Sequence, residues 1–535
     1  MDNFIKPNKN NKFILLIACL AFGFAVILFF SKSSPLYFTN DWVDANAFYS
    51  VGKGIAHGKV PYKDLFEQKG ILLYLFHTIA YKISPTSFFG VYLLEGISFS
   101  ITLFLFFKIA RFYFSKTNAF FITCLTPLFL INKEYFRFGD SAEEFAFPFL
   151  LSLLYLIVSV ANEEKKIKGV DFFFQGMFMG CVFWIKYTMI SPWIAFFLFA
   201  GIYYIVQRKF ENLLKAIICS LLGYLIVSFP VIIYFVLNHA LDDMIFVYFK
   251  FNMVLYPQLV NQSVNVHLLS RFANTMKIFW DFLSINKAIL FITVVGTFHL
   301  LFSRNIFAEV KYKILWLSIL ICTNFFTFYG GIPSGYYMLL NMPILLISFL
   351  SFFVLTKFVL QSCKITTRYP ELIHFSQFIL IGLALIVIVQ SNDNYKDLRF
   401  FVNRPGVQIK NAENTISNSK EPAQLEFAKY MKGNHISLLN YGFVDYGFSV
   451  KPNIVPNLKY FMNVNIPYNV YPESMDEQNK YIEKKKVDFV VAGLGENENP
   501  DQYGTPWLHI NYKPIAIHVQ SREDMILKYV LYKKR

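Results

Sequence analysis

Apolar runs of about 18 to 22 residues recur along the chain up to residue 390. A helix of that length crosses the ~30 Å hydrocarbon core of a bilayer, where the backbone must satisfy its own hydrogen bonds. Of the 535 residues, 55% are hydrophobic and 16% are charged, whereas soluble domains average about 25% charged residues. The sequence therefore predicts an all-α polytopic membrane domain.

The apolar runs predict about eleven transmembrane helices. They fall at 13–30, 87–107, 117–132, 144–161, 170–186, 188–206, 215–237, 287–303, 313–330, 337–356 and 372–390. Lys and Arg cluster in alternate loops, and acids cluster in several of the loops between them. Because basic loops stay on the cytoplasmic side, we predict a cytoplasmic N-terminus and an extracytoplasmic region after residue 390. The net charge of +15 is explained by this orientation, so no nucleic-acid partner is expected.

The region 391–535 is richer in Asn, Asp, Lys and Pro than the membrane domain 1–390. Short apolar runs at 435–441, 487–492, 515–519 and 526–531 predict strands, and 475–486 predicts a helix. A small extracytoplasmic α/β domain is expected there. The six cysteines lie mostly in apolar spans and show no CxxC spacing, so neither a disulfide framework nor a zinc site is indicated.

The first outer loop, 31–86, is the candidate catalytic loop because it combines charged residues with short apolar helices. The stretch 40–74 holds Asp41, Asp44, Asp64, Glu67 and Lys69. Apolar residues recur at helical spacing over 45–55, and 71–83 is apolar but too short to span, so both predict helices at the membrane surface. A carboxylate partly buried by such helices can act as a general base, although acids in an outer loop are more often simply solvated.

Three further groups near predicted outer ends of spans have a structural interpretation, and for two of them the residues also allow a functional one. Ser141 with Glu144 forms a capping box, while Arg137, Asp140 and Glu143 beside it could contact a substrate. Lys186 could extend its ammonium to the interface or bind a lipid phosphate. The segment 329–337, which includes Tyr336 and Tyr337, fits an aromatic belt with turn residues.

An ordered set of residues in the first outer loop resembles a known family. The set is Asp44, Phe48, Gly52, Ile55, Gly58, Pro61, Tyr62, Asp64, Phe66, Glu67, Lys69 and Gly70. It is similar to the first outer loop of GT-C glycosyltransferases, in the branch of protein O-mannosyltransferases and lipid A aminoarabinose transferases. The run from Glu143 to Phe149 resembles that family's second acidic motif. Gln68 departs from the pattern, since many relatives have a histidine there.

The resemblance implies an enzyme of a bacterial plasma membrane that moves a monosaccharide from a polyprenyl-phosphate donor to an acceptor hydroxyl on the outer face, with inversion. The acceptor is a protein, lipid A or a glycan. The implied catalytic residues are Asp44 as base, Glu67 and Asp140. The implied substrate-binding residues are Lys69, Arg137, Glu144, Lys186, Tyr336 and Tyr337. No cofactor is indicated by the residues, and a divalent cation, which some relatives bind, is left open.

Two alternatives remain at this stage. A transporter or flippase of lipid-linked sugars would show charges within its spans and internal repeats, and the sequence shows few such charges and no repeat. A polysaccharide polymerase or ligase would share the large outer loop and the lipid-linked substrate. It would place key arginines in a late loop, where Arg271 is the candidate.

Overall fold

The computed structural model describes residues 9–163, 166–260, 268–330, 332–363, 370–401, 408–411, 416–418, 421–433, 435–495, 498–522 and 525–535. Lys165, Lys364 and Arg368, which belong to the predicted cytoplasmic loops, lie outside these residues. The chain divides into two compact units. The first contains Met1–Phe30, Glu95–Pro230 and Asn265–Tyr395, and the second contains Ser31–Leu94, Val231–Val264 and Lys396–Arg535. Thus the predicted catalytic loop belongs to the same unit as the C-terminal region.

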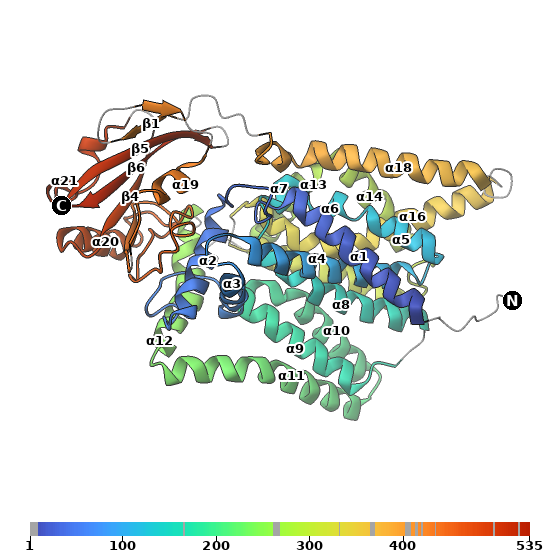
Figure 1. Cartoon of the computed structure of the whole chain (residues 1–535). Coiled ribbons are helices and arrows are strands. Elements are labelled where there is room, and N and C mark those ends of the chain that lie inside the picture. Colours follow the sequence, from blue (N-terminus) through green and yellow to red (C-terminus); the bar gives the residue numbers. More distant parts are fainter. Residues whose placement is uncertain are drawn as a thin grey trace. The chain divides into compact units, whose positions relative to one another are not determined.

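Helices make up the first unit (Figure 1). Its elements, some of which continue into the second unit, are α1 (Lys9–Phe30), α4 (Phe89–Ala110), α5 (Lys116–Cys124), α6 (Pro127–Leu130), α7 (Lys133–Phe136), α8 (Ala142–Glu163), α9 (Gly169–Ile185), η1 (Tyr187–Ile190), α10 (Ser191–Val206), α11 (Phe210–Leu237), α13 (Leu268–Ile285), α14 (Lys287–Phe302), α15 (Val310–Phe328), η4 (Gly335–Asn341), α16 (Met342–Ser362) and α18 (Pro370–Ser391). Gly176 of α9 lies against the backbone of α11, and Gly296 of α14 lies against that of α16. Small residues at these crossings allow the helices to approach closely, as is common in membrane helix pairs.

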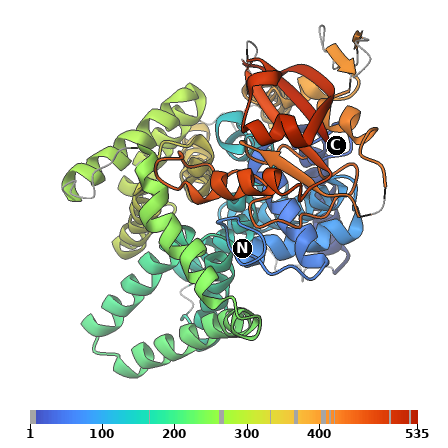
Figure 2. The same ribbon diagram turned by 90° about the vertical axis from the view of Figure 1, so that its left-hand side faces the viewer.

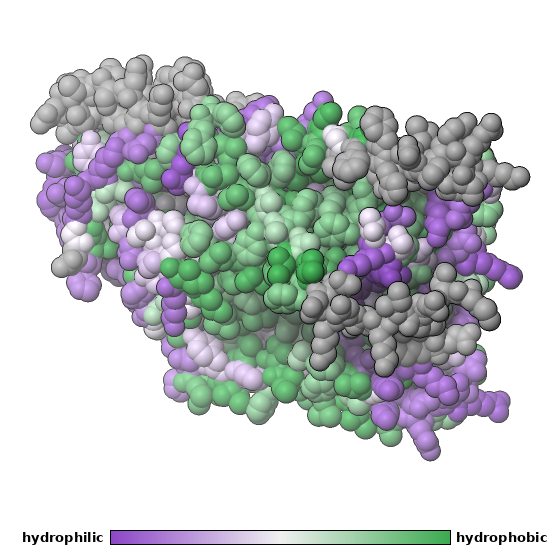
Figure 3. Space-filling view, turned by 45° about the vertical axis from the view of Figure 1, so that its right-hand side comes forward, coloured by the Kyte–Doolittle hydropathy of each residue, from purple (hydrophilic) through white to green (hydrophobic). Residues whose placement is uncertain are grey.

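Many large apolar side chains of these helices are exposed, notably along α11. Figure 3 shows a broad hydrophobic surface. Water would not tolerate so much exposed apolar area on a monomer, whereas lipid would. Among the described residues, six helices are long and apolar enough to cross a membrane, or up to seven if the bent pair α13 and α14 counts as one span. The protein is therefore a multi-pass integral membrane protein.

Every predicted span lies on helical structure, but the predicted single helix at 117–132 is wrong. This stretch forms α5 and α6, separated by Leu125 and Thr126. Pro127 begins α6, and proline cannot donate the backbone hydrogen bond that would continue α5. The helix α9 has 17 residues, fewer than the about 20 of a typical transmembrane helix. The helices α13 and α14 are bent by 120° relative to each other. These features account for three of the predicted spans that are not, as single helices, long and apolar enough to cross a membrane.

The second unit contains the helices of the first loop and the C-terminal sheet. Its remaining elements are α2 (Val43–Ala56), α3 (Ile71–Ile83), α12 (Leu241–Met244), η2 (Ile245–Leu255), η3 (Tyr256–Val260), η5 (Asn394–Asp397), β1 (Gln408–Asn411), β2 (Ile416–Asn418), α19 (Ala423–Ala428), β3 (Leu438–Tyr441), α20 (Glu473–Glu483), β4 (Phe489–Gly495), η6 (Pro500–Gln502), α21 (Pro506–Asn511), β5 (Tyr512–Arg522) and β6 (Met525–Lys534). The helices predicted over 45–55 and 71–83 of the loop are present as α2 and α3, and their position at the membrane surface stays a prediction.

The C-terminal sheet is six-stranded, with the order β2-β1-β5-β6-β4-β3. Strands β3 and β4 are parallel, with Leu438 opposite Phe489, and the other neighbours are antiparallel. Figure 2 shows the long strands β5 and β6, in red, as the centre of this layer. The four predicted strands and the helix between them are confirmed, and β1 and β2 are additional. A buried cluster that includes Phe427, Phe448 and Tyr529 forms the core of this region.

Candidate active site

The predicted base and the predicted phosphate-binding lysine of the first loop lie side by side. Asp44 is in the first turn of α2, and its Oδ2 is 3.8 Å from the Nζ of Lys69. Asp44 is 25% exposed, whereas Lys69 is 10% exposed. The ammonium of Lys69 also lies 5.5 Å from the ring centroid of Phe48, one turn along α2. An accessible carboxylate thus adjoins a mostly buried cation.

The carboxylate of Glu67 holds the backbone of Lys69. Its Oε2 accepts a hydrogen bond from the Lys69 N–H at 2.9 Å and another from the hydroxyl of Tyr74. The hydroxyl of Tyr62 donates to the Lys69 carbonyl at 2.6 Å. Burial, and secondarily the nearby Glu67 carboxylate, raises the pKa of Tyr74 well above its usual value, so this hydroxyl stays protonated and able to donate. Both backbone polar groups of Lys69 are therefore fixed.

The remaining acids of the loop have structural partners. Asp64 accepts a hydrogen bond from the Val60 N–H at 2.8 Å and closes the turn before α3. Asp41 forms an ion pair with Lys32 at 3.0 Å, and Lys32 is also 2.6 Å from Asp397. Burial lowers the pKa of Lys32, but Asp41 and Asp397 outweigh that effect and raise it above its usual value.

In the first unit, Asp140 lies in an unusual backbone segment. Arg137 has φ +57°, Gly139 has φ +83° and Asp140 has φ +68°. Left-handed conformations cost about 1–3 kcal/mol for a residue other than glycine, so the surroundings must hold them. The Oε1 of Glu95 accepts the Asp140 N–H at 2.6 Å, and Asn394 Nδ2 donates to the Arg137 carbonyl at 2.7 Å. Strain of this kind is concentrated at functional sites.

Lys186, Glu143 and Tyr337 form a second group in the first unit. The Nζ of Lys186 is 2.7 Å from Glu143 Oε1 and 3.8 Å from the ring centroid of Tyr337. Tyr336 is further from the ammonium, at 5.7 Å. The other oxygen of Glu143, Oε2, is buried and has no hydrogen-bond partner among the described residues. Because Lys186 already pairs with an acid, it is not merely extended to the membrane surface.

The capping box at the start of α8 is confirmed. Glu144 Oε2 accepts the Ser141 N–H at 2.8 Å, and Ser141 Oγ accepts the Glu144 N–H at 3.1 Å. Glu144 therefore has the structural role that its spacing predicts, and a substrate-binding role remains a prediction. Arg137 is half-buried, and its guanidinium has no ion-pair partner among the described residues.

The structure thus gathers the predicted residues in two sets. Asp44, Glu67 and Lys69 lie together in the second unit, and Lys186, Tyr336 and Tyr337 lie together in the first. The contacts of two acids of the first unit were not predicted from the sequence: Glu143 pairs with Lys186, and Glu95 accepts the Asp140 N–H. Glu95 is a buried acid within the predicted span 87–107, and an ionisable residue in such a span is a functional candidate by default. That signal could have identified it.

The described residues do not fit a metal site. No group of three or more His, Cys, Asp or Glu side chains is arranged to hold a metal ion in the part of the chain that the structure describes. Near Asp44 the neighbouring charged group is the ammonium of Lys69, and the ligand-type oxygen of Glu67 is already hydrogen-bonded. A cation ligand set requires several free oxygen or nitrogen donors, which this cluster does not supply.

Comparison with known proteins gives one family match and several similar solved structures. Residues 68–234 match the protein family described as dolichyl-phosphate-mannose-protein mannosyltransferase. No curated protein matches the chain. Among solved structures, ArnT from Cupriavidus metallidurans bound to undecaprenyl phosphate is similar, with a TM-score of 0.57, 9% identity and 98% of each chain covered. The apo state of the same protein gives a TM-score of 0.51 at 10% identity, again over 98% of each chain.

The structural likeness establishes the fold, and the family match covers the segment from Gln68 through most of α11. Together they confirm the resemblance predicted from the first outer loop. The protein has an ArnT-like fold in a membrane, and its residues 68–234 are similar to the family of dolichyl-phosphate-mannose-protein mannosyltransferases.

Proposed function

We propose that this enzyme transfers a monosaccharide from a polyprenyl-phosphate donor to an acceptor hydroxyl, with inversion at the sugar carbon. The pair of Asp44 and Lys69, 3.8 Å apart, carries this proposal. A single displacement needs a base for the incoming hydroxyl and a cation for the departing phosphate, and the pair supplies one of each. The acceptor is a protein, lipid A or a glycan.

The donor class is supported by the similar structure. ArnT from Cupriavidus metallidurans was solved with undecaprenyl phosphate bound, and its fold is shared over nearly the whole length of both chains. A polyprenyl tail dissolves in the bilayer, which places the phosphate and sugar at the membrane boundary where the short helices α2 and α3 are expected. We therefore propose the same chemical class of donor for this protein.

In the proposed reaction, Asp44 removes the proton of the acceptor hydroxyl as its oxygen attacks the sugar C1. The bond between C1 and the phosphate oxygen breaks, and polyprenyl phosphate leaves with the electron pair. Lys69 stabilises the charge that develops on that phosphate. Glu67 acts by positioning, because its carboxylate holds the Lys69 backbone and the Tyr74 hydroxyl.

The residues of the first unit are proposed as substrate contacts. Lys186 and Arg137 would bind a phosphate, and Tyr336 or Tyr337 would donate a hydrogen bond to it. Asp140 and Glu144 would orient the sugar or the acceptor. The strained backbone at Asp140, held by Glu95 at 2.6 Å, supports a role in substrate contact because such strain must be maintained against its own cost.

We propose that the reaction takes place on the outer face of a bacterial plasma membrane. The alternation of basic and acidic loops supports a cytoplasmic N-terminus, about eleven spans and an extracytoplasmic C-terminal region. Nucleotide sugars remain in the cytoplasm, so transfer outside needs a lipid-linked donor. The sequence shows few charges within its spans and no internal repeat, whereas the alternative of a transporter would show both.

The test replaces Asp44 with asparagine in membranes supplied with a labelled polyprenyl-phosphate sugar. Loss of a general base typically lowers the rate by about 10²- to 10⁴-fold, and we expect the turnover number of Asp44→Asn to fall within that range. The matched control is Asp41→Asn, which removes the same charge three residues earlier but leaves Lys32 paired with Asp397. Undiminished transfer by Asp44→Asn, or equal loss in both variants, contradicts the assignment.

A further inference from the structure

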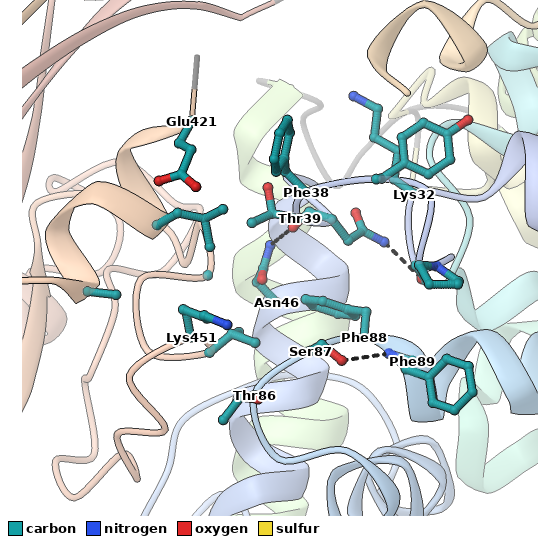
Figure 4. Close-up of a pocket in the computed structure, with 18 of the residues that line it drawn as sticks. Lys32, Phe38, Thr39, Asn46, Thr86, Ser87, Phe88, Phe89, Glu421 and Lys451 are labelled. Carbon is teal, nitrogen blue, oxygen red and sulfur yellow. Dashed lines mark hydrogen bonds between the residues drawn. The ribbon is translucent and has the colours of Figure 1, made fainter. Parts of the chain in front are cut away.

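A cavity of about 580 Å³ lies within the second unit, away from the pair of Asp44 and Lys69. Its lining comes from the loop that follows α1, from residues 86–89 before α4, from Asn46 of α2 and from the C-terminal region. Figure 4 shows Asn46, Ser87 and Phe88 on one side and Lys451 and Glu421 on the other. None of the residues to which we assign catalytic or donor-binding roles lines it.

The lining is rich in cations. It contains Lys32, Arg399, Lys429, Lys432 and Lys451, and a single acid, Glu421. Lys32 is neutralised by Asp41 and Asp397, and Lys429 by Glu421 and Glu426. The other three cations form no ion pair with any described residue. Their charge is therefore available to a ligand.

The side chain of Arg399 is held in place by two contacts, and among the described residues its outer guanidinium donors have no partner. Its Nε donates to the Tyr37 carbonyl at 2.7 Å, and its guanidinium lies 5.2 Å from the ring centroid of Phe38. A guanidinium carries five N–H donors, so the outer part of this group remains able to bind a phosphate or carboxylate in a forked arrangement. The exposed ammonium groups of Lys432 and Lys451 can add point charges.

The rest of the lining suits a polar ring or polyol. Thr39, Thr86 and Ser87 contribute hydroxyl groups, and Phe38, Phe88 and Phe89 contribute aromatic surfaces. Ser87 Oγ lies 2.7 Å from Ser84 Oγ and accepts the Phe89 N–H at 3.3 Å, which fixes it at the cavity edge. Hydroxyls together with aromatic faces bind sugars well, because a sugar presents both O–H groups and an apolar C–H face.

The geometry of α2 separates this cavity from the reaction centre. Asn46 follows Asp44 by two positions, and successive residues of an α-helix are rotated by about 100°. The two side chains therefore lie about 200° apart, on opposite sides of the helix. A ligand in the cavity therefore lies on the side of α2 opposite Asp44 and does not present a hydroxyl group to that carboxylate.

We propose that this cavity is a second binding site, which holds a phosphate-bearing sugar or polyol. Arg399, Lys432 and Lys451 bind the phosphate, and the hydroxyl and aromatic residues contact the sugar or polyol. The ligand is either the headgroup of a lipid or a free sugar phosphate, since the two share this chemistry. The inference concerns binding alone and does not depend on the transfer reaction.

The test measures binding to the purified full chain in detergent with two probes, glucose 1-phosphate by calorimetry and dioleoylphosphatidylglycerol by native mass spectrometry. We compare Lys432→Gln/Lys451→Gln with Lys484→Gln/Lys513→Gln, which removes two exposed lysines of the same region outside the cavity. Loss of two phosphate contacts should raise the dissociation constant about tenfold in the first variant and leave it unchanged in the second. Glucose without phosphate serves as the uncharged control probe.

A selective loss of glucose 1-phosphate binding supports the proposal with a free sugar phosphate as a sufficient ligand. If the first variant loses binding of phosphatidylglycerol and not of glucose 1-phosphate, the result supports the proposal with a lipid headgroup as the ligand. The proposal is overturned if both double variants bind both probes alike, or if glucose binds as well as glucose 1-phosphate. Equal thermal midpoints for the two variants show that both remain folded, because all four lysines are exposed.

Discussion

At the scale of single residues, the acids of the first outer loop have different partners. Asp64 accepts a backbone N–H, Asp41 neutralises Lys32, and Asp44 faces Lys69. Their surroundings in the sequence are alike, because each is an aspartate in a polar loop beside apolar residues. The ordered motif that resembles the GT-C family includes Asp44 and omits Asp41, and the contacts give Asp41 a partner in Lys32 and Asp44 one in Lys69.

Glu143 is expected to matter for stability through Lys186. Glu143 is 2% exposed, and its partner Lys186 is 15% exposed. Removing one member of a mostly buried ion pair leaves the other charge without compensation, at a cost of about 3–5 kcal/mol. We expect Glu143→Gln to lower the thermal midpoint of the protein in detergent, and Glu143→Gln/Lys186→Gln to recover most of the loss.

The control for this prediction is Lys133→Gln. Lys133 pairs with Asp393 in the same unit, but the two side chains are 38% and 35% exposed. Exposed pairs contribute about 0–1 kcal/mol, so the midpoint should change little. A double variant that is less stable than Glu143→Gln would contradict an interpretation based on the uncompensated charge of Lys186.

At the scale of elements, the packing of α2 against α3 depends on Gly52. A Cβ atom at this position would lie 2.6 Å from the carbonyl carbon of His77, closer than any unstrained contact. The hydroxyl of Thr78 in α3 donates to the Gly52 carbonyl in α2 at 3.1 Å, and this hydrogen bond links the two helices at the same point. The helix that carries Asp44 can therefore approach α3 only because residue 52 has no side chain.

We accordingly expect Gly52→Ala to move α2 away from α3. Overpacking of this kind costs about 1–3 kcal/mol, and it displaces Asp44 as well, so both the thermal midpoint and the transfer rate should fall. Gly330→Ala is the matched control, because a Cβ there meets no atom within 4 Å. Normal transfer by Gly52→Ala would show that the separation of α2 and α3 does not set the position of Asp44.

The elements themselves were largely predictable from hydrophobic patterns. The loop helix predicted at 71–83 is α3, Ile71–Ile83, because a run of apolar residues without Pro or Gly favours a helix wherever it is buried or in contact with lipid. The strands β1 and β2 were not predicted, since Gln408–Asn411 and Ile416–Asn418 are too short and polar to show alternation. β1 becomes a strand by pairing with β5, and β2 by pairing with β1.

At the scale of the whole molecule, the first loop is bound to the C-terminal region by buried polar contacts. Lys53 Nζ donates to the Ser449 carbonyl at 2.9 Å and to the Ile454 carbonyl at 3.2 Å. Ser50 Oγ donates to Asp445 Oδ2 at 2.6 Å. These groups are buried, so each contact replaces water that the side chains would otherwise bind. The C-terminal region therefore supports the helix that carries the proposed base.

These contacts predict a dependence of stability on pH. Burial lowers the pKa of Lys53 to about 7 from an ordinary value of 10.5, although Asp445 acts in the opposite direction. Between these two values the unfolded chain binds more protons than the folded chain, so the free energy of unfolding rises with pH. Below about pH 7 Lys53 is protonated in both states, and its contribution no longer changes. The rise should be absent from Lys53→Met.

The measurement is the thermal midpoint of wild type, Lys53→Met and the exposed-residue control Lys82→Met at about pH 6.5, 8 and 9.5. Other titrating groups are common to all three proteins, so the difference in slope reports Lys53. Asp445 does not produce the same signal, because burial raises the pKa of its carboxyl, and a raised carboxyl pKa makes stability fall as pH rises through it. Equal slopes for wild type and Lys53→Met would contradict the prediction.

The sequence by itself determined the membrane class, most of the helices and strands, and the resemblance of the first outer loop to GT-C enzymes. These depend on local patterns, namely the length of apolar runs, their period and the order of residues in a motif. The tertiary structure alone decided that Asp44 meets Lys69, that Glu143 pairs with Lys186, and that Lys53 is buried beside Asp445. Such pairings depend on which side of each element faces another part of the chain, and local spacing does not specify partners that are tens or hundreds of residues apart.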